Sequence, residues 1–247
     1  MPFKSSKISY GLPHDDYPKE HINDCISDFK EILNLKYEPV GVSFIFDEEE
    51  YAAVKADEPS APMPYCVMVK NAAQGKALKS RLLHHKCDGG TTALGLERST
   101  QRIENGAEYF SYNLYESQAA ARRHRASIKS LHSSEPLTYG IVTCPLKDCT
   151  KAPDVVIGIV NAFQAMRIVQ GNTYATGIKP NIDLGAMQGM CSEATVVPYL
   201  SGDLNVSVLC PSTRMLCKWD ESEMAVGIPF ERFEPIVRGV MATQMKY

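Results

Sequence analysis

Apolar residues recur at helical spacing in several parts of the chain. Ile22, Ile26, Phe29 and Leu33 are three or four positions apart, which predicts an amphipathic helix over residues 19–35, with Cys25 in the core beside this stripe. Two later helices are predicted to end at Gly75 and Gly171, and Pro198 limits the length of a third. The further helices are predicted at 65–75, after the CDGG turn at 87–90, at 113–131, 161–172, 191–200 and 230–247.

Short runs rich in Val, Ile and Phe predict strands at 39–46, 137–146, 153–160, 204–210 and 223–229. Residues 1–18 are polar and predict a loose N-terminal arm, and 47–64 read as an acidic surface connection. Because strands and helices do not alternate strictly, residues 19–247 predict a single α+β domain with a mixed sheet and flanking helices. The order of strand, glycine-terminated helix and cysteine occurs in both halves, which is consistent with a degenerate internal duplication.

Composition and charge exclude several classes of partner. The 247 residues are 44% hydrophobic and 22% charged, with a net charge of −3, so neither a nucleic-acid nor an anionic-membrane partner is expected. The basic cluster 122–125 is interpreted as a solvated helix face. No apolar run reaches the ~18 residues of a membrane span, and the N-terminus lacks the apolar core of a signal peptide. We therefore expect a cytoplasmic protein.

Eight cysteines in a reducing compartment indicate metal binding or redox chemistry rather than disulfides. Four of them are predicted at the start of a helix: Cys66, Cys87, Cys191 and Cys210. Free N–H groups at a helix start favour a thiolate and stabilise an anionic group such as an iron–sulfur cluster. The alternative for each is a small buried side chain.

The spacings between cysteines exclude some kinds of site. No C-x₂-C occurs, which argues against a zinc ribbon, a ferredoxin run or a thioredoxin-like pair. Cys144 and Cys149 have the spacing of half a zinc knuckle, without an evident second half. Cys217 is a reserve ligand. His84 and His85 are interpreted as a solvated pair.

Two charged residues near the cysteines are candidate catalytic groups. Arg214 has the geometry to bind an anionic substrate in a bidentate manner, or it is a surface arginine near Asp220 or Glu221. Glu193 transfers protons if it is buried beside the cluster, or it is a favourable first-turn charge.

Motifs over roughly residues 30–240 resemble the domain of unknown function family numbered 169. They include YCVMVKNAAQGK, CDGGTTALGL, PDVVIGIVNAFQAMRIVQ and MCSEATVVPYLSGDLNVSVLCPSTR. The resemblance implies that the typical cysteines of the family are Cys66, Cys87, Cys191 and Cys210, and that Cys144, Cys149 and Cys217 are additional. It implies no settled reaction. The family is common in anaerobes and archaea, which suits an oxygen-sensitive cofactor and a role in anaerobic metabolism.

These observations predict a cytoplasmic iron–sulfur protein with a 4Fe-4S cluster. If three thiolates bind, the open iron acts on a small substrate, as in a lyase, desulfidase or reductase. If four bind, electron transfer is favoured. A redox or ligand sensor and a zinc-binding structural module also stay open as classes of function. The expected partner is a small-molecule substrate or an electron donor, with no nucleic acid and no membrane, and a homo-oligomer is compatible with the sequence.

Overall fold

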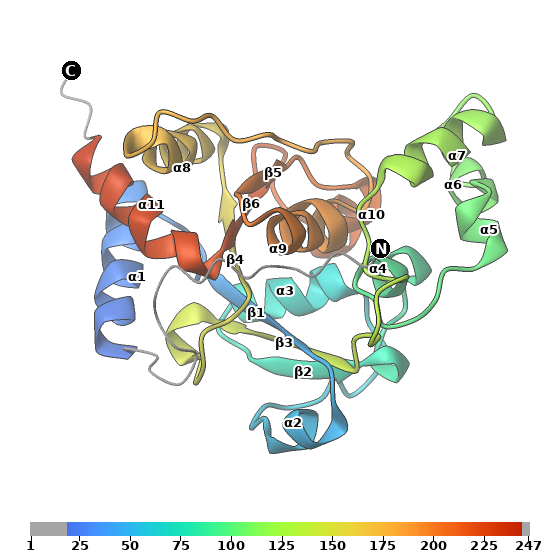
Figure 1. The fold of residues 1–247 in the computed structure, drawn as a ribbon, viewed down its shortest axis with the longest axis horizontal. Coiled ribbons are helices and arrows are strands. Elements are labelled where there is room, and N and C mark those ends of the chain that lie inside the picture. Colours follow the sequence, from blue (N-terminus) through green and yellow to red (C-terminus); the bar gives the residue numbers. More distant parts are fainter. Residues whose placement is uncertain (1–18, 244–247) are drawn as a thin grey trace.

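The computed structural model describes residues 19–243, and the predicted N-terminal arm lies outside them. The described residues form one six-stranded sheet in the order β2-β3-β1-β4-β6-β5 (Figure 1). Its strands are β1 (Val40–Ile45), β2 (Leu78–Arg81), β3 (Gly140–Pro145), β4 (Val155–Val160), β5 (Asn205–Ser207) and β6 (Met224–Pro229). The α+β class is confirmed. The sheet is antiparallel at each strand pair, so the expectation of a mixed sheet is wrong.

Helices connect the strands and cover both faces of the sheet (Figure 1). The α-helices are α1 (Lys19–Leu33), α2 (Glu48–Ala53), α3 (Tyr65–Ala73), α4 (Asp88–Ala93), α5 (Gln101–Glu104), α6 (Ala107–Phe110), α7 (Gln118–Ser127), α8 (Ala162–Tyr174), α9 (Val197–Ser201), α10 (Pro211–Cys217) and α11 (Phe230–Ala242). The other helical segments are the single turns η1 (Leu82–His84) and η2 (Leu146–Asp148) and the π-helix η3 (Gly189–Val196). Among the described helices, none is long and apolar enough to cross a membrane.

The two faces of the sheet bury separate hydrophobic clusters, because side chains alternate along each strand. On one face, Val40, Val42 and Ile157 pack against α3 and η3. On the other, Val156 and Ile228 pack against α1, α8 and α11. Every residue of the central strand β4 is buried, as expected for a strand covered on both sides.

Helix α8 runs through Gly171 instead of ending there, so the predicted end of this helix is wrong. Gly171 lies where α8 crosses α11, and a Cβ at this position would stand 2.7 Å from the carbonyl oxygen of Ile236. The residue is glycine because the two helix backbones approach closely, not because the chain turns.

Other predicted boundaries differ because local capping or tertiary pairing decides them. The helix predicted at 113–131 is confined to α7, where the Ser117 side chain accepts from the amide of Ala120. The strand predicted at 204–210 ends at Ser207. Strand β2 was not predicted, because LKSR contains no β-branched residue and forms a strand only through its pairing with β3.

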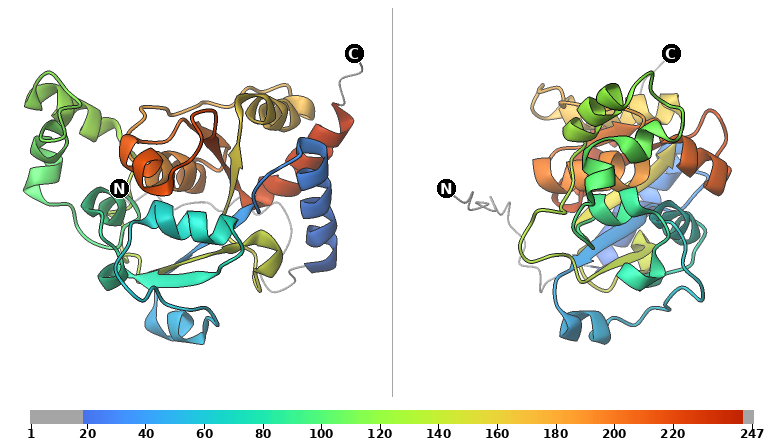
Figure 2. Two further views of the ribbon diagram at one scale, coloured as in Figure 1. Left: turned by 180° about the vertical axis from the view of Figure 1, so that it is seen from behind. Right: turned by 90° about the vertical axis from the view of Figure 1, so that its right-hand side faces the viewer.

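Helices α5, α6 and α7 project from one end of the molecule, as both views show (Figures 1 and 2). They bury a small cluster of their own, which contains Ile103, Tyr109, Ala121 and Met187. Arg125 is only 3% exposed and donates to Glu104 at 2.8 Å. The basic cluster 122–125 is therefore not entirely a solvated face.

Candidate functional site

The four predicted cysteines occupy the beginnings of four separate elements. Cys87 is the N-cap of α4, Cys210 is the N-cap of α10 before Pro211, and Cys66 is the second residue of α3. These placements confirm the prediction. Cys191 is the third residue of η3, which begins at Gly189, two residues before the helix predicted at 191–200. Its thiol donates to the carbonyl of Gln188 at 3.6 Å.

These four thiols lie within electrostatic reach of one another. Burial raises the pKa of Cys191 well above its usual range, and the charges of Cys87, Cys210 and Cys66 raise it further. Burial likewise raises the pKa of Cys87, to which the charges of Cys66 and Cys210 contribute. Because such effects fade over short distances, the fold gathers the four thiols into one region.

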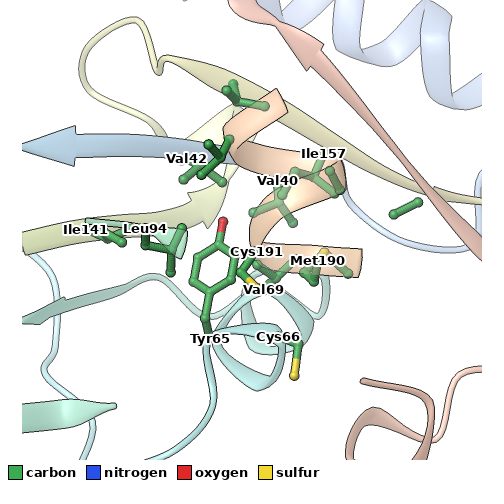
Figure 3. Packing of buried hydrophobic residues seen from close by; sticks show 14 of the residues in the cluster. Val40, Val42, Tyr65, Cys66, Val69, Leu94, Ile141, Ile157, Met190 and Cys191 are labelled. Carbon is green, nitrogen blue, oxygen red and sulfur yellow. The ribbon is translucent and has the colours of Figure 1, made fainter. Parts of the chain in front are cut away.

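This region borders the cluster beneath α3 and η3. Figure 3 shows Cys191 beside Val69 and Met190, whereas the sulfur of Cys66 points away from Tyr65 and from the centre of the packing. Cys87 and Cys210 are only partly buried. The cysteine region therefore has a dry inner side and an outer side nearer to solvent.

Close backbone contact joins the Cys191 and Cys210 segments. A Cβ at Gly189 would stand 2.6 Å from the Cα of Leu209 and 2.8 Å from the amide nitrogen of Cys210. Gln188 and Leu209, which precede these segments, have positive φ angles of 54° and 69°. Left-handed backbone at non-glycine residues costs about 1–3 kcal/mol and persists only where the surrounding structure imposes it.

Cys217 adds a fifth thiol to the region. A hydrogen bond from Cys217 lowers the pKa of Cys66 to about 7, and the same bond raises the pKa of Cys217. Cys217 is fully buried, and its carbonyl accepts from the Lys70 ammonium at 2.6 Å, which fixes α10 against α3. The reserve ligand therefore lies beside Cys66.

Glu193 is buried in η3, with 4% of its surface exposed. Its two carboxylate oxygens accept from the amide of Gly185 at 2.7 Å and from the hydroxyl of Ser207 at 2.6 Å. Burial raises its pKa, and the amide groups of residues 185–187 oppose that rise. The alternative of a first-turn charge is wrong, because Glu193 lies inside the helix. The carboxylate ties the loop before η3 to β5, and its predicted role in proton transfer stays a prediction.

Arg214 donates to three backbone carbonyls. Its guanidinium contacts the oxygens of Val208 and Glu223 at 2.9 Å each and that of Asp220 at 3.1 Å. These bonds fix the chain just before Cys210. Binding of an anionic substrate by Arg214 stays a prediction, and the observed contacts assign it a positioning role.

Cys25, Cys144 and Cys149 lie in the cluster on the opposite face. Across residues 19–243, no group of three or more His, Cys, Asp or Glu side chains is arranged to hold a single metal ion. The pair Cys144 and Cys149 thus finds no second half of a zinc knuckle in the described part of the chain.

The histidines before Cys87 are not a solvated pair. His84 is 6% exposed and lies 3.6 Å from Glu58. The His85 ring contacts the Ser80 hydroxyl at 3.1 Å, and burial lowers the pKa of His85 to about 4. Both side chains thus pack against the protein in the segment that leads to Cys87.

Sequence reasoning missed two polar residues of the region, Tyr109 and Gln188. The amide nitrogen of the Gln188 side chain donates to the Tyr109 hydroxyl at 2.8 Å and to the carbonyl of Gly89 at 2.7 Å. This contact brings α6 to the start of both α4 and η3. No local pattern in the sequence predicts it, because 79 positions separate the two side chains.

Comparison with known proteins gives a family and one relative. The sequence pattern of DUF169, described as "Uncharacterised ArCR", matches residues 28–239. The uncharacterized protein MJ0308 of Methanocaldococcus jannaschii is 25% identical over 178 residues, which cover 71% of this chain and 75% of that protein. No solved structure matches the chain.

Proposed function

The chain belongs to the DUF169 family, and we propose that it is an iron–sulfur protein whose cluster is bound by Cys66, Cys87, Cys191 and Cys210. The observation that carries the proposal is that Cys66, Cys87 and Cys210 lie close enough for their charges to act on Cys191, although the four come from separate elements. Packing alone gives no reason to gather them, since a small buried residue is equally stable anywhere in the core.

The donor set fits the chemistry of such a cluster. Thiolates are the usual ligands of iron–sulfur clusters, and each binds a different iron atom. The sulfurs of four ligands therefore stand roughly 6–7 Å apart, farther than ligands of a single ion. The raised pKa values of Cys87 and Cys191 also fit, because bound iron would offset the burial and the repulsion that oppose their deprotonation.

With only three of these thiolates bound, the proposed function is that of an enzyme which acts on a small substrate at an open iron, of the lyase, desulfidase or reductase type. Cys66 is the ligand most easily spared, because its sulfur already has Cys217 and Thr213 as hydrogen-bonding partners. A cluster held by Cys87, Cys191 and Cys210 would leave one iron available as a Lewis acid. The cytoplasm is the compartment that suits reduced thiols.

The presence of a fourth thiol favours electron transfer as the second candidate. In that case Cys66 completes the cluster and no iron is open. Replacing Cys66 by serine separates the two candidates: an open-iron site keeps its iron content, whereas a four-thiolate site loses part or all of it. Cys217→Ala is the matched control, because it removes the hydrogen bond to Cys66 without removing a proposed ligand.

Protein purified without oxygen tests the cofactor itself. We expect a brown protein with about four irons and four acid-labile sulfides per chain. Stoichiometric zinc without labile sulfide would overturn the proposal and favour a structural zinc module.

A further inference from the structure

Two buried tyrosines flank Cys191. Tyr65 of α3 and Tyr109 of α6 are 2% and 4% exposed. Burial raises the pKa of both, and the charge of Cys191 adds to the rise in each; Cys66 contributes at Tyr65, whereas Cys87 contributes at Tyr109. Both hydroxyls therefore lie in the cysteine region, and they differ only in their hydrogen bonds.

The hydroxyl of Tyr65 is satisfied within the protein. Thr195 gives its own proton to the carbonyl of Met190 at 2.7 Å. The 3.0 Å bond between Tyr65 and Thr195 must then use the proton of Tyr65. Tyr65 has an acceptor and needs no ligand.

The hydroxyl of Tyr109 is in the opposite situation. A carbonyl only accepts, so the contact with Gly89 shows which side of the Gln188 amide is nitrogen. That nitrogen gives its second proton to Tyr109, which is therefore an acceptor in this bond. Within residues 19–243, the Tyr109 proton has no acceptor and Gln188 Oε1 has no donor.

An unused donor and an unused acceptor thus lie side by side. Gln188 is 5% exposed, and its backbone holds the left-handed conformation before η3. Its amide is also confined by Gly89, where a Cβ would stand 2.7 Å from its nitrogen. Buried polar groups are normally paired, so two neighbouring unpaired atoms in a fixed geometry indicate a missing partner.

We infer that Tyr109 and Gln188 form a ligand-recognition pair beside the cysteines, for a small molecule with an amide-like edge. The ligand's carbonyl or thiocarbonyl accepts from the Tyr109 hydroxyl, and its neighbouring N–H donates to Gln188 Oε1. This inference takes the cysteine region of the proposed function as the site but requires no bound metal, so it stands or falls separately from the cluster.

The test uses acetamide and N,N-dimethylacetamide as probes. Their binding to the full chain is followed by ligand-observed NMR, with iron-loaded and iron-free samples. Acetamide should bind saturably, and Tyr109→Phe should weaken its binding roughly five- to tenfold, because one buried hydrogen bond is lost. Tyr65→Phe is the matched control and should leave the affinity unchanged. N,N-dimethylacetamide has no N–H and should bind the unaltered chain more weakly than acetamide.

Equal affinity of acetamide for the unaltered chain and for Tyr109→Phe would overturn the inference, as would the absence of saturable binding, which assigns the two atoms to water. The comparison of the two probes needs no variant, so it decides the matter even if Tyr109→Phe does not fold. If acetamide binds as expected to a chain that takes up no iron, the inference holds and the cluster proposal fails. If the chain takes up iron but acetamide binds the unaltered chain and Tyr109→Phe equally, only the inference is rejected.

Discussion

The two faces of the sheet use cysteine in different ways. Cys25, Cys144 and Cys149 lie among aliphatic and aromatic side chains beneath α1, α8 and α11. Cys144 faces Gly41 across the β1–β3 pair, and a Cβ at Gly41 would lie 2.5 Å from the sulfur of Cys149. These thiols fill the small spaces that a close-packed core leaves.

The opposite face places its thiols within electrostatic reach of one another, and Cys66 and Cys217 share a hydrogen bond. Burial and the charges of Cys87, Cys210 and Cys66 raise the pKa of Cys191, and a hydrogen bond between Cys66 and Cys217 shifts the pKa of both. Strained backbone precedes two of the thiols on this face, at Gln188 and Leu209. The contrast shows that thiols of similar burial differ in their neighbours and in the strain of the backbone before them, which is the basis of the proposed cluster.

The largest expected effect comes from separating the Cys191 and Cys210 segments. Gly189→Ala forces a Cβ against the backbone of Leu209 and Cys210, so we expect a loss of roughly 3 kcal/mol in unfolding free energy and loss of bound iron. Urea unfolding and iron analysis measure the two effects. Gly158→Ala is the control, because its Cβ meets only a 3.5 Å contact with Val160. Equal behaviour of the two variants would show that the close contact is not required.

Acid should lower the unfolding free energy through His85, which lies two residues before Cys87. His85 has a pKa of about 4 in the folded chain, against an ordinary value of 6.5, so it is neutral when folded. Between these two pH values the unfolded chain binds more protons at His85 than the folded chain does. The contribution of neutral His85 to the unfolding free energy is therefore fully present above pH 6.5 and is lost as the pH falls towards 4. The loss attributable to His85 is at most about 3 kcal/mol.

Unfolding free energies measured from pH 7 to pH 4 test this expectation. His85→Asn should flatten the pH dependence. A profile that His85→Asn does not alter would assign the acid sensitivity to another group.

A smaller effect is expected at Arg214. Arg214→Lys keeps the positive charge but not the fork that holds three carbonyls, so we expect a loss of about 2 kcal/mol in unfolding free energy. Arg232→Lys is the control, since that arginine forms an exposed pair with Asp203. Unchanged stability together with lost turnover would instead favour the predicted anion-binding role.

The smallest change concerns reactivity rather than stability. In iron-free, reduced protein, alkylation of Cys66 by iodoacetamide should rise between pH 6 and 8, because its pKa of about 7 makes it a thiolate in that range. Burial raises the pKa of Cys25, so its labelling should require more alkaline pH. Peptide mass spectrometry measures both rates, and parallel pH profiles would contradict the contrast between the two faces.

Local signals allowed much of the fold to be predicted from sequence. The stripe from Ile22 to Leu33 repeats at helical spacing, and the Val-rich run of β4 is apolar over its whole length. The helix starts near Cys66 and at Cys210 follow from Pro64 and Pro211, which occupy positions where a helix needs no amide hydrogen.

Long-range contacts decided the remainder. Strand β2 depends on β3, and the passage of α8 through Gly171 depends on α11. From the sequence alone, Arg214 is a candidate anion-binding residue. In the structure its guanidinium donates to the carbonyls of Val208 and Glu223. The four cysteines come together for the same reason. Each belongs to a separate element, and no local sequence pattern places these elements beside one another.

Iron and acid-labile sulfide in anaerobically purified Cys191→Ser and Cys144→Ser test the central claim most directly. The two residues have similar exposure, 8% and 7%, and lie on opposite faces of the sheet. We predict that Cys191→Ser loses most of its iron and sulfide, while Cys144→Ser retains the content of the unaltered chain. Equal iron and sulfide in both variants would contradict the account.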